Sequence, residues 1–572
     1  MPFRPLPVHL LKRTTHNLQL PGRILHQRHA HSERASPVSN RGNPNPNNPA
    51  PPPTDSGRTN THLDNKSEIE FTLQPNYIQP TAHVASVFAR GFAYTGAVLI
   101  SLGVVAFLGF EGTHLYVENI AIPAPPVDGD EDAVWGWAAS GRESWTGVGK
   151  GGTDPALGYK TRHLLRAAWM AQNWGAGTGS QVDQDGLPKG TASGGTGYHL
   201  SEQFLARALT QADLTSAPSG SSLSPTLIDI ITLHARVLER LGSPEALSRA
   251  RADYIRLWGS LSNDVRTHVE AAQVAIKIGD LSGRLKNGEM AEEWWQRALE
   301  YATLSGGDTN ASSQLGTPPL SIVPHLLPPS PPAQRAVVSA LVSLSGYYAT
   351  TQRFDKAAAV ENAALRLLSA SSTQKVTGVM DSHSTASPHS APGALHSLFM
   401  QHRSSILSVH LAEVLYATRA TTQPKSRFSR KKTEDVVAPS QIHLHLAATT
   451  SEKVAYALTG TTEPHAGESS AITRGLAPIY AENPSLARPA EELLRDSRRT
   501  AAEAWNLSGL LYELEGRPDT SERALECFER AVHWAGGHDA PKASDTDVTQ
   551  QDWKTYWDNY SRTKERMTWS GK

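Results

Sequence analysis

The most constraining feature of the chain is one uncharged stretch of 20 residues, Gly91 to Phe110. It reads GFAYTGAVLISLGVVAFLGF and is bounded by Arg90 before it and Glu111 after it. An α-helix rises about 1.5 Å per residue, so about 20 apolar residues cross a hydrocarbon core of about 30 Å. No other stretch of this kind occurs in the sequence. The chain is therefore predicted to cross a lipid bilayer once, as a transmembrane helix over 91–110.

Small residues recur at every fourth position within this stretch. Ala93, Ala97 and Ser101 follow the spacing, and Gly96 and Gly103 lie on a neighbouring face of the same helix. Small side chains let two transmembrane helices approach closely in lipid. The stripe predicts a contact with a membrane-embedded partner. The alternative is that it reflects the general abundance of glycine and alanine in spanning helices.

The residues before the span have the composition of a mitochondrial targeting sequence. The first 32 residues contain no acidic side chain and include five basic ones, Arg4, Lys12, Arg13, Arg23 and Arg28. An arginine-rich, acid-poor N-terminus is typical of a transit peptide, whereas a secretory signal carries an apolar run of about 7–15 residues. We expect a presequence over 1–35, with a disordered basic tail as the alternative. A proline- and asparagine-rich disordered linker is expected over 36–84.

The charges on either side of the span predict its orientation. His83 and Arg90 precede it, and acidic side chains follow it at Glu111, Glu118, Asp128, Asp130, Glu131 and Asp132. Basic residues tend to stay on the side of the membrane that is not translocated. We therefore expect a single-pass protein of the mitochondrial inner membrane. Its N-terminus would lie in the matrix and its C-terminal domain in the intermembrane space.

The sequence offers no constellation of residues that would carry out catalysis. The single cysteine, Cys527, excludes an internal disulfide and a cysteine-based zinc site. The segment GVGKGG at 147–152 resembles a phosphate-binding loop, but Gly151 stands where Ser or Thr must follow Lys150. The net charge of −1 gives no basis for nucleic-acid binding. We expect a non-enzymatic protein with no cofactor, no metal and no nucleic-acid partner.

The C-terminal region reproduces most of the tetratricopeptide pattern W-x₂-L-G-x₂-Y…A-x₃-F. Ser508 replaces the leucine of the pattern, and three extra residues separate the two predicted helices. In such repeats, small residues let two antiparallel helices close up while aromatic residues fill the groove between them. The matching positions in this unit are Trp505, Gly509, Tyr512, Ala524, Phe528 and Ala531.

A second unit, starting near residue 334, has the same spacing without an insertion. Glu361 stands where the repeat usually has phenylalanine. Weaker units upstream bring the number of helical hairpins to about six, enough for a solenoid. The predicted fold is all-α, with a transmembrane helix followed by a degenerate tetratricopeptide-like α-solenoid over 156–537. The matching positions of the second unit are Leu341, Leu344, Ser345, Tyr348, Ala357 and Ala364.

Three further segments allow two interpretations each. The segment 111–155 carries Trp residues among glycines, and would either cap the first helices or contact a membrane partner or the lipid interface. A basic run at 425–432 is either a solvated loop or a contact with anionic lipid. A helix over 550–569 is either a cap on the last repeat or a docking face for a partner, because its aromatic residues share one side. Those aromatic residues are Trp553, Tyr556, Trp557 and Tyr560, and those of the first segment are Trp135, Trp137 and Trp145.

The leader, the span and the repeat domain together resemble the fungal tetratricopeptide-repeat adaptor subunit of the mitochondrial inner-membrane i-AAA protease supercomplex. The resemblance covers about 85–570 and is strongest in HLYVEN after the span, in SILSVHLAEVLYA and in AWNLSGLLYELEG. It implies a non-enzymatic adaptor that binds unfolded or membrane-protein substrates in a groove. The partners would be AAA protease subunits and the lipid bilayer, within a large hetero-oligomer. The alternatives are a mitochondrial assembly or import factor built of the same repeats, or an enzyme of unrecognised class.

Overall fold

The computed structural model describes residues 78–122, 134–137, 145, 151–175, 193–215, 223–262, 264, 267–304, 323–377, 390–422, 431–461, 475–515, 518–536 and 550–570. Within these ranges the chain is helical and contains no strand. The presequence and most of the linker expected from the sequence lie outside them. The described residues fall into two compact units, one ending at Leu115 and the other beginning at Tyr116.

The first unit is formed by a single long helix, α2, which runs from Ile78 to Tyr116 over 39 residues, so that its last residue belongs to the second unit. At about 1.5 Å per residue it is about 58 Å long, well beyond the thickness of a hydrocarbon core. It is the one described helix that is long and apolar enough to cross a membrane. Large apolar side chains such as Phe92, Leu99 and Val105 are exposed along it.

The start of α2 corrects the linker predicted over 36–84, because residues 78–84 are helical. Pro80 lies in the first helical turn, where its missing N–H costs no hydrogen bond. From residue 81 to Arg90 no glycine or proline interrupts the chain. The hydroxyls of Thr95 and Ser101 donate to the carbonyls of Gly91 and Ala97, four residues earlier, so these polar groups are satisfied within the helix.

The second unit is a helical domain. It opens with a π-helical turn at Val117–Ala121, directly after α2. The α-helices that follow are α5 (Tyr159–Trp174), α6 (Ser193–Thr215), α7 (Pro225–Leu241), α8 (Pro244–Leu261), α9 (His268–Arg284), α10 (Gly288–Leu304), α11 (Pro331–Thr350), α12 (Phe354–Thr377), α13 (Ala391–Thr422), α14 (Lys431–Thr459), α16 (Pro478–Ala481), α17 (Ala487–Glu515), α18 (Pro518–Trp534) and α19 (Gln550–Ser570).

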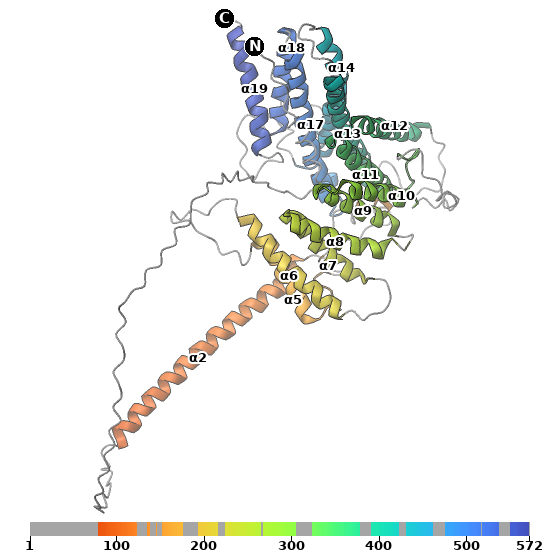
Figure 1. Cartoon of the computed structure of the whole chain (residues 1–572). Helices are drawn as coiled ribbons and strands as arrows, with labels where there is room; N and C mark the ends of the chain where they lie inside the picture. The colour runs from red at the N-terminus through yellow and green to blue at the C-terminus, as the bar shows by residue number, and fades with distance from the viewer. Residues whose placement is uncertain are drawn as a thin grey trace, which may run out of the picture. The chain divides into compact units, whose positions relative to one another are not determined.

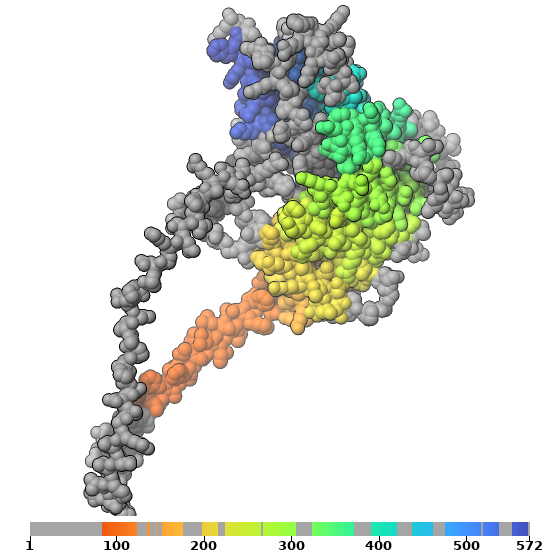
Figure 2. All heavy atoms as spheres, in the orientation of Figure 1, coloured from red at the N-terminus to blue at the C-terminus, as the bar shows by residue number. Residues whose placement is uncertain are grey.

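These helices pack in the order in which the chain presents them (Figure 1). Each helix from α5 to α14 contacts the next, α14 contacts α17, and α17, α18 and α19 follow in turn. Contacts also skip one helix, as between α9 and α11 and between α11 and α13. In the space-filling view, the bands from yellow α6 to green α11 adjoin one another (Figure 2). The core is therefore built by neighbours along the chain.

Local sequence signals set the ends of these helices. Ser224 and Ser243 cap α7 and α8, because their hydroxyls accept from the backbone N–H three residues later, and a proline follows each serine. Gly242 ends α7 in the left-handed conformation, with φ of 69°. The sequence LGSPEA therefore turns α7 sharply into α8. Further along, Lys431 and Lys432 begin α14 rather than belonging to the predicted basic loop, the rest of which lies outside the described residues.

Two hydrophobic clusters fill the domain. The first is lined mainly by α5 to α12 and the second mainly by α13 to α19. Helix α13 belongs to both, because Leu407 and Val414 pack into the first cluster while Leu395 and Val409 pack into the second. This explains why its 32 residues are buried on more than one side.

Carboxylates reinforce the contacts between successive helices. Glu452 of α14 accepts hydrogen bonds from the indole N–H groups of both Trp505 and Trp534, each at 2.7 Å. Such hydrogen bonds fix the mutual rotation of three helices, since the indole and the acceptor must both be in place. Similar bonds join Tyr254 to Glu239 across α7 and α8, Trp295 to Asp280 across α9 and α10, and Tyr348 to Glu292 across α10 and α11.

We predict that Gly509→Ala destabilises the domain by about 1–3 kcal/mol, because overpacking forces a core to shift. A Cβ at Gly509 would lie 2.6 Å from Cε1 of the fully buried Phe528. Thermal unfolding followed by far-UV circular dichroism measures the effect. Gly259→Ala is the matched control, because nothing lies within 4 Å of its Cβ position on α8. The control is expected to stabilise by about 0.5–1 kcal/mol. Equal effects of the two substitutions would contradict the prediction.

Candidate functional site

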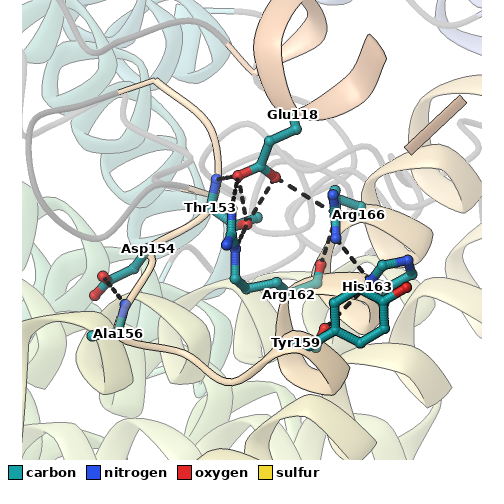
Figure 3. Close-up of polar contacts among 8 residues, drawn as sticks. All are labelled: Glu118, Thr153, Asp154, Ala156, Tyr159, Arg162, His163 and Arg166. Atoms are coloured by element: carbon teal, nitrogen blue, oxygen red, sulfur yellow. Dashed lines mark hydrogen bonds and ion pairs between the residues drawn. The ribbon is translucent and has the colours of Figure 1, made fainter. Parts of the chain in front are cut away.

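Among the described residues of the connection between α2 and α5, two groups of side chains and backbone atoms are hydrogen-bonded to the helices of the domain. We call them the Glu118 anchor and the Trp-Gly-Trp anchor. In the Glu118 anchor, the carboxylate of Glu118 in the π-helical turn accepts from the backbone N–H of Thr153 at 3.0 Å and from its hydroxyl at 2.8 Å (Figure 3). Arg162 Nη2 donates to Glu118 Oε1 at 2.6 Å, and Arg166 Nε lies 3.6 Å from Oε2.

Helix geometry explains why two guanidinium groups meet one carboxylate. Arg162 and Arg166 are four residues apart on α5, so both project from the same face. Arg162 Nε also donates to the Thr153 hydroxyl at 3.1 Å, and Arg166 Nη2 contacts Nδ1 of His163 at 2.8 Å. The carboxylate thus has charged and neutral donors on several sides, which a buried anion requires.

Gly152 is needed for this approach of the loop to the π-helical turn. Its φ is +81°, a conformation that favours glycine, and a Cβ would lie 2.8 Å from the carbonyl oxygen of Glu118. Its backbone N–H donates to the carbonyl of Ile122 at 3.1 Å. Asp154 extends the anchor, because its carboxylate accepts from the N–H of Ala156 and from the hydroxyl of Thr226 at the start of α7.

The pKa of Glu118 is lowered. Burial alone would raise it, but the hydrogen bonds from Arg162 and Thr153 and the positive charge of Arg162 outweigh that effect. The carboxylate is therefore ionised at neutral pH, and its contribution to stability is lost only as the pH falls through this lowered pKa. The geometry makes the anchor a structural clamp that holds the residues directly after α2 against α5.

The Trp-Gly-Trp anchor consists of residues 134–137, with Trp135 and Trp137 buried. Arg335 of α11 lies 200 positions further along the chain. Its Nη2 donates to the carbonyl oxygens of Trp135 at 2.7 Å and Gly136 at 3.2 Å. Its guanidinium lies 3.9 Å from the centroid of the Trp137 ring. The Trp137 indole N–H donates to the carbonyl of Pro392 at the start of α13, at 3.0 Å.

The pocket that receives this turn comes from α11 and α13. His396 packs its ring against Trp135, with centroids 5.6 Å apart, and Phe399 meets Trp137 edge-on. His396 Nε2 contacts the side-chain oxygen of Gln334 at 3.0 Å, which assigns the proton to Nε2 and leaves Nδ1 to accept from Arg335. Burial lowers the pKa of Arg335 to about 9, so the guanidinium is still protonated at neutral pH.

The connection therefore joins both hydrophobic clusters. Val117, Ile122 and Trp145 pack into the first cluster, and Trp135 and Trp137 pack into the second. Neither anchor was predicted from the sequence, although the tryptophans of this segment were noted there. No local sequence pattern identifies the residues that hold the anchors, because Arg162 and Arg335 lie 44 and 200 positions along the chain from the groups they bind.

The predicted repeat-signature residues do not converge on one site. They are distributed between the contact of α11 with α12 and the contact of α17 with α18. All are buried except Tyr512, which is half-buried: Leu341, Leu344, Ser345, Tyr348, Ala357, Ala364, Trp505, Gly509, Ala524, Phe528 and Ala531. On α2, residues 93, 97 and 101 of the predicted contact stripe are exposed.

The described residues hold no group of three His, Cys, Asp or Glu side chains that could bind a metal. Cys527 is buried in α18, and burial raises its pKa to about 12, so it stays a thiol at neutral pH. At the C-terminus, α19 packs on α18. It is tied to α17 by Asn559, which donates to Asn506 at 2.8 Å, and by Thr563, which donates to Glu513 at 2.6 Å. These hydrogen bonds hold α19 against α17.

Glu361 is an isolated acid in the interior of α12. It is fully buried, and within the described part of the chain neither carboxylate oxygen has a hydrogen-bond partner. Burial, together with repulsion from Glu413 of α13, raises its pKa well above 4.5. The sequence had marked this position as a departure from the repeat, and the structure places the acid where the repeat would bury an aromatic ring.

Comparison with known proteins does not identify the chain. No model of a known protein family matches the chain, and no curated protein matches it.

Replacing Thr153 with valine should loosen the Glu118 anchor without unfolding the domain. The isosteric valine removes the hydroxyl that bonds both Glu118 and Arg162, a loss of about 1–3 kcal/mol for a buried polar contact. Hydrogen exchange should then rise in residues 117–122 and stay unchanged in α17 and α18. Thr153→Ser, which keeps the hydroxyl, is the control. Uniformly faster exchange throughout the domain would refute a local role.

Glu361→Gln should make the domain more stable at pH 8 and leave it almost unchanged at pH 5. A carboxyl whose pKa is raised on folding favours the folded state below its unfolded value of 4.5, and that advantage is lost as the pH rises. Melting temperatures measured from pH 5 to pH 8 test this. Glu300→Gln, at an exposed position of α10, is the control. A constant difference between Glu361→Gln and wild type across the range would rule out titration of this group.

Proposed function

We propose that the chain is a non-enzymatic, membrane-anchored adaptor that binds proteins through a degenerate tetratricopeptide-like α-solenoid. In this proposal it recruits unfolded or membrane-protein substrates to the i-AAA protease of the mitochondrial inner membrane. The observation that carries the proposal is the direct continuation of one long apolar helix, α2, into an all-helical domain through the clamped Glu118 anchor.

The order of helix contacts supports the solenoid. Helices of a solenoid touch their neighbours in sequence and the next ones but one, as α9, α11 and α13 do here. Gly509 against Phe528 is the close approach of small and aromatic residues that such repeats use. Arrays of this kind hold peptide segments or helices on an extended surface.

The Glu118 anchor supports a role beside a membrane. Glu118, Thr153 and Arg162 hold the residues directly after α2 against the first helix of the domain. The arginine-rich leader and the acids after the span support the mitochondrial inner membrane, with the helical domain in the intermembrane space.

Native gel electrophoresis of mitochondria solubilised in mild detergent tests the proposal. The tagged full-length chain should co-migrate with the AAA protease, and its deletion should slow the turnover of protease substrates. Ala93→Leu with Ala97→Leu tests whether the small-residue stripe makes the contact, and Val98→Leu with Val105→Leu serves as the control. Co-migration with an import or assembly complex instead would favour the alternative. Recovery only as a free monomer would reject the adaptor.

A further inference from the structure

The pocket between α11 and α13 has the properties of a site for a ligand rather than of an ordinary core. Contacts that do not involve the Trp-Gly-Trp anchor hold part of its wall. Gln334 Nε2 donates to the carbonyl of Pro328 at 2.8 Å, its side-chain oxygen contacts His396 at 3.0 Å, and α11 packs directly on α13. Part of the receptor side is therefore held by contacts that are independent of residues 134–137.

The positive charge of Arg335 in this pocket is paired with backbone carbonyl groups. Buried guanidinium groups usually pair with a carboxylate. In the described part of the chain, no carboxylate pairs with Arg335. Among the described residues, its polar partners are two backbone carbonyls of the turn and Nδ1 of His396. Backbone carbonyls are present in any peptide, so this recognition does not require that the ligand belong to the same chain.

The pocket also sets a sequence requirement. Gly136 has a φ of +59°, and a Cβ there would lie 2.7 Å from Cγ of Pro332. The flanking indoles fill spaces beside His396 and Phe399, and the second indole must also donate to the carbonyl of Pro392. The ligand must therefore present an aromatic residue, a glycine and a tryptophan in succession, in a turn.

We propose that the pocket between α11 and α13 is a recognition site for aromatic-glycine-tryptophan turns of other proteins, which residues 134–137 of the chain itself occupy in this structure. A partner that presents such a turn displaces the internal one. The inference rests on the proposed protein-binding role of the helical domain, and it is independent of which complex the chain joins.

The test uses the purified full-length chain in detergent and a fluorescent peptide, DAVWGWAAS, which copies residues 132–140. Fluorescence anisotropy measures binding to wild type and to the double variant Trp135→Ala with Trp137→Ala, whose pocket is emptied. The emptied variant should bind the peptide at least tenfold more tightly than wild type. A peptide with alanine at the central glycine should bind at least tenfold more weakly, and Arg335→Gln in the emptied variant should abolish binding.

A second variant keeps the test decisive if the emptied one does not fold. Gly136→Ala retains both indoles but disfavours the internal turn, and should also raise peptide affinity. If a folded variant binds neither peptide, or binds both equally, the site is only a structural contact and the proposal fails. If light scattering shows a wild-type dimer that the emptied variant loses, the occupant is a second copy, and a separate partner is rejected. Binding of the peptide without co-migration with the protease would reject the proposed complex and keep this site.

Discussion

The buried carboxylate of Glu118 is the interaction on which the arrangement of the connection depends. An ionised group without partners in a protein interior costs several kcal/mol, so the fold must bring donors to it. Those donors come from the loop at Thr153 and from two successive turns of α5. Satisfying one charge therefore fixes three segments at once. The π-helical turn, with Glu118 within it, places the acid directly after α2, so the constraint acts at the exit of the apolar helix.

The two anchors differ in how their charge is balanced, and the difference has a consequence for exchange. At the first anchor an anion meets two cations, and removing either side would strand a charge. At the second anchor the cation Arg335 meets neutral carbonyls, and its exposure to water on release would restore its hydration. The first contact is suited to permanence and the second to replacement. If residues 134–137 were displaced, the connection would therefore stay attached to α5 through the Glu118 anchor.

The sequence predicted the helices well and the tertiary contacts poorly, for identifiable reasons. The apolar stretch at 91–110 and the helical periodicity are signals between residues close in sequence, so α2, α11, α12, α17 and α18 could be anticipated. The helix start at Ile78 was missed because the proline-rich composition upstream suggested a linker that continued to residue 84. From the sequence, Glu118 was interpreted only as one of the acidic residues that predict the orientation of the span. Nothing local to it encodes Arg162, 44 residues away, and nothing near Trp135 encodes Arg335.

The departures from the repeat pattern gain a physical meaning in the structure. Ser508 and Glu361 are both buried, and in each the side-chain oxygens lack a hydrogen-bond partner among the described residues. Each such group lowers the stability of the helices that enclose it. Glu361 lies on α12, which packs against both α11 and α13, the two helices that form the Trp-Gly-Trp pocket. Local stability in a domain of neighbouring helices is roughly a sum of neighbouring terms. The unpaired carboxyl of Glu361 therefore lowers the stability of the helices on which the Trp-Gly-Trp anchor is built.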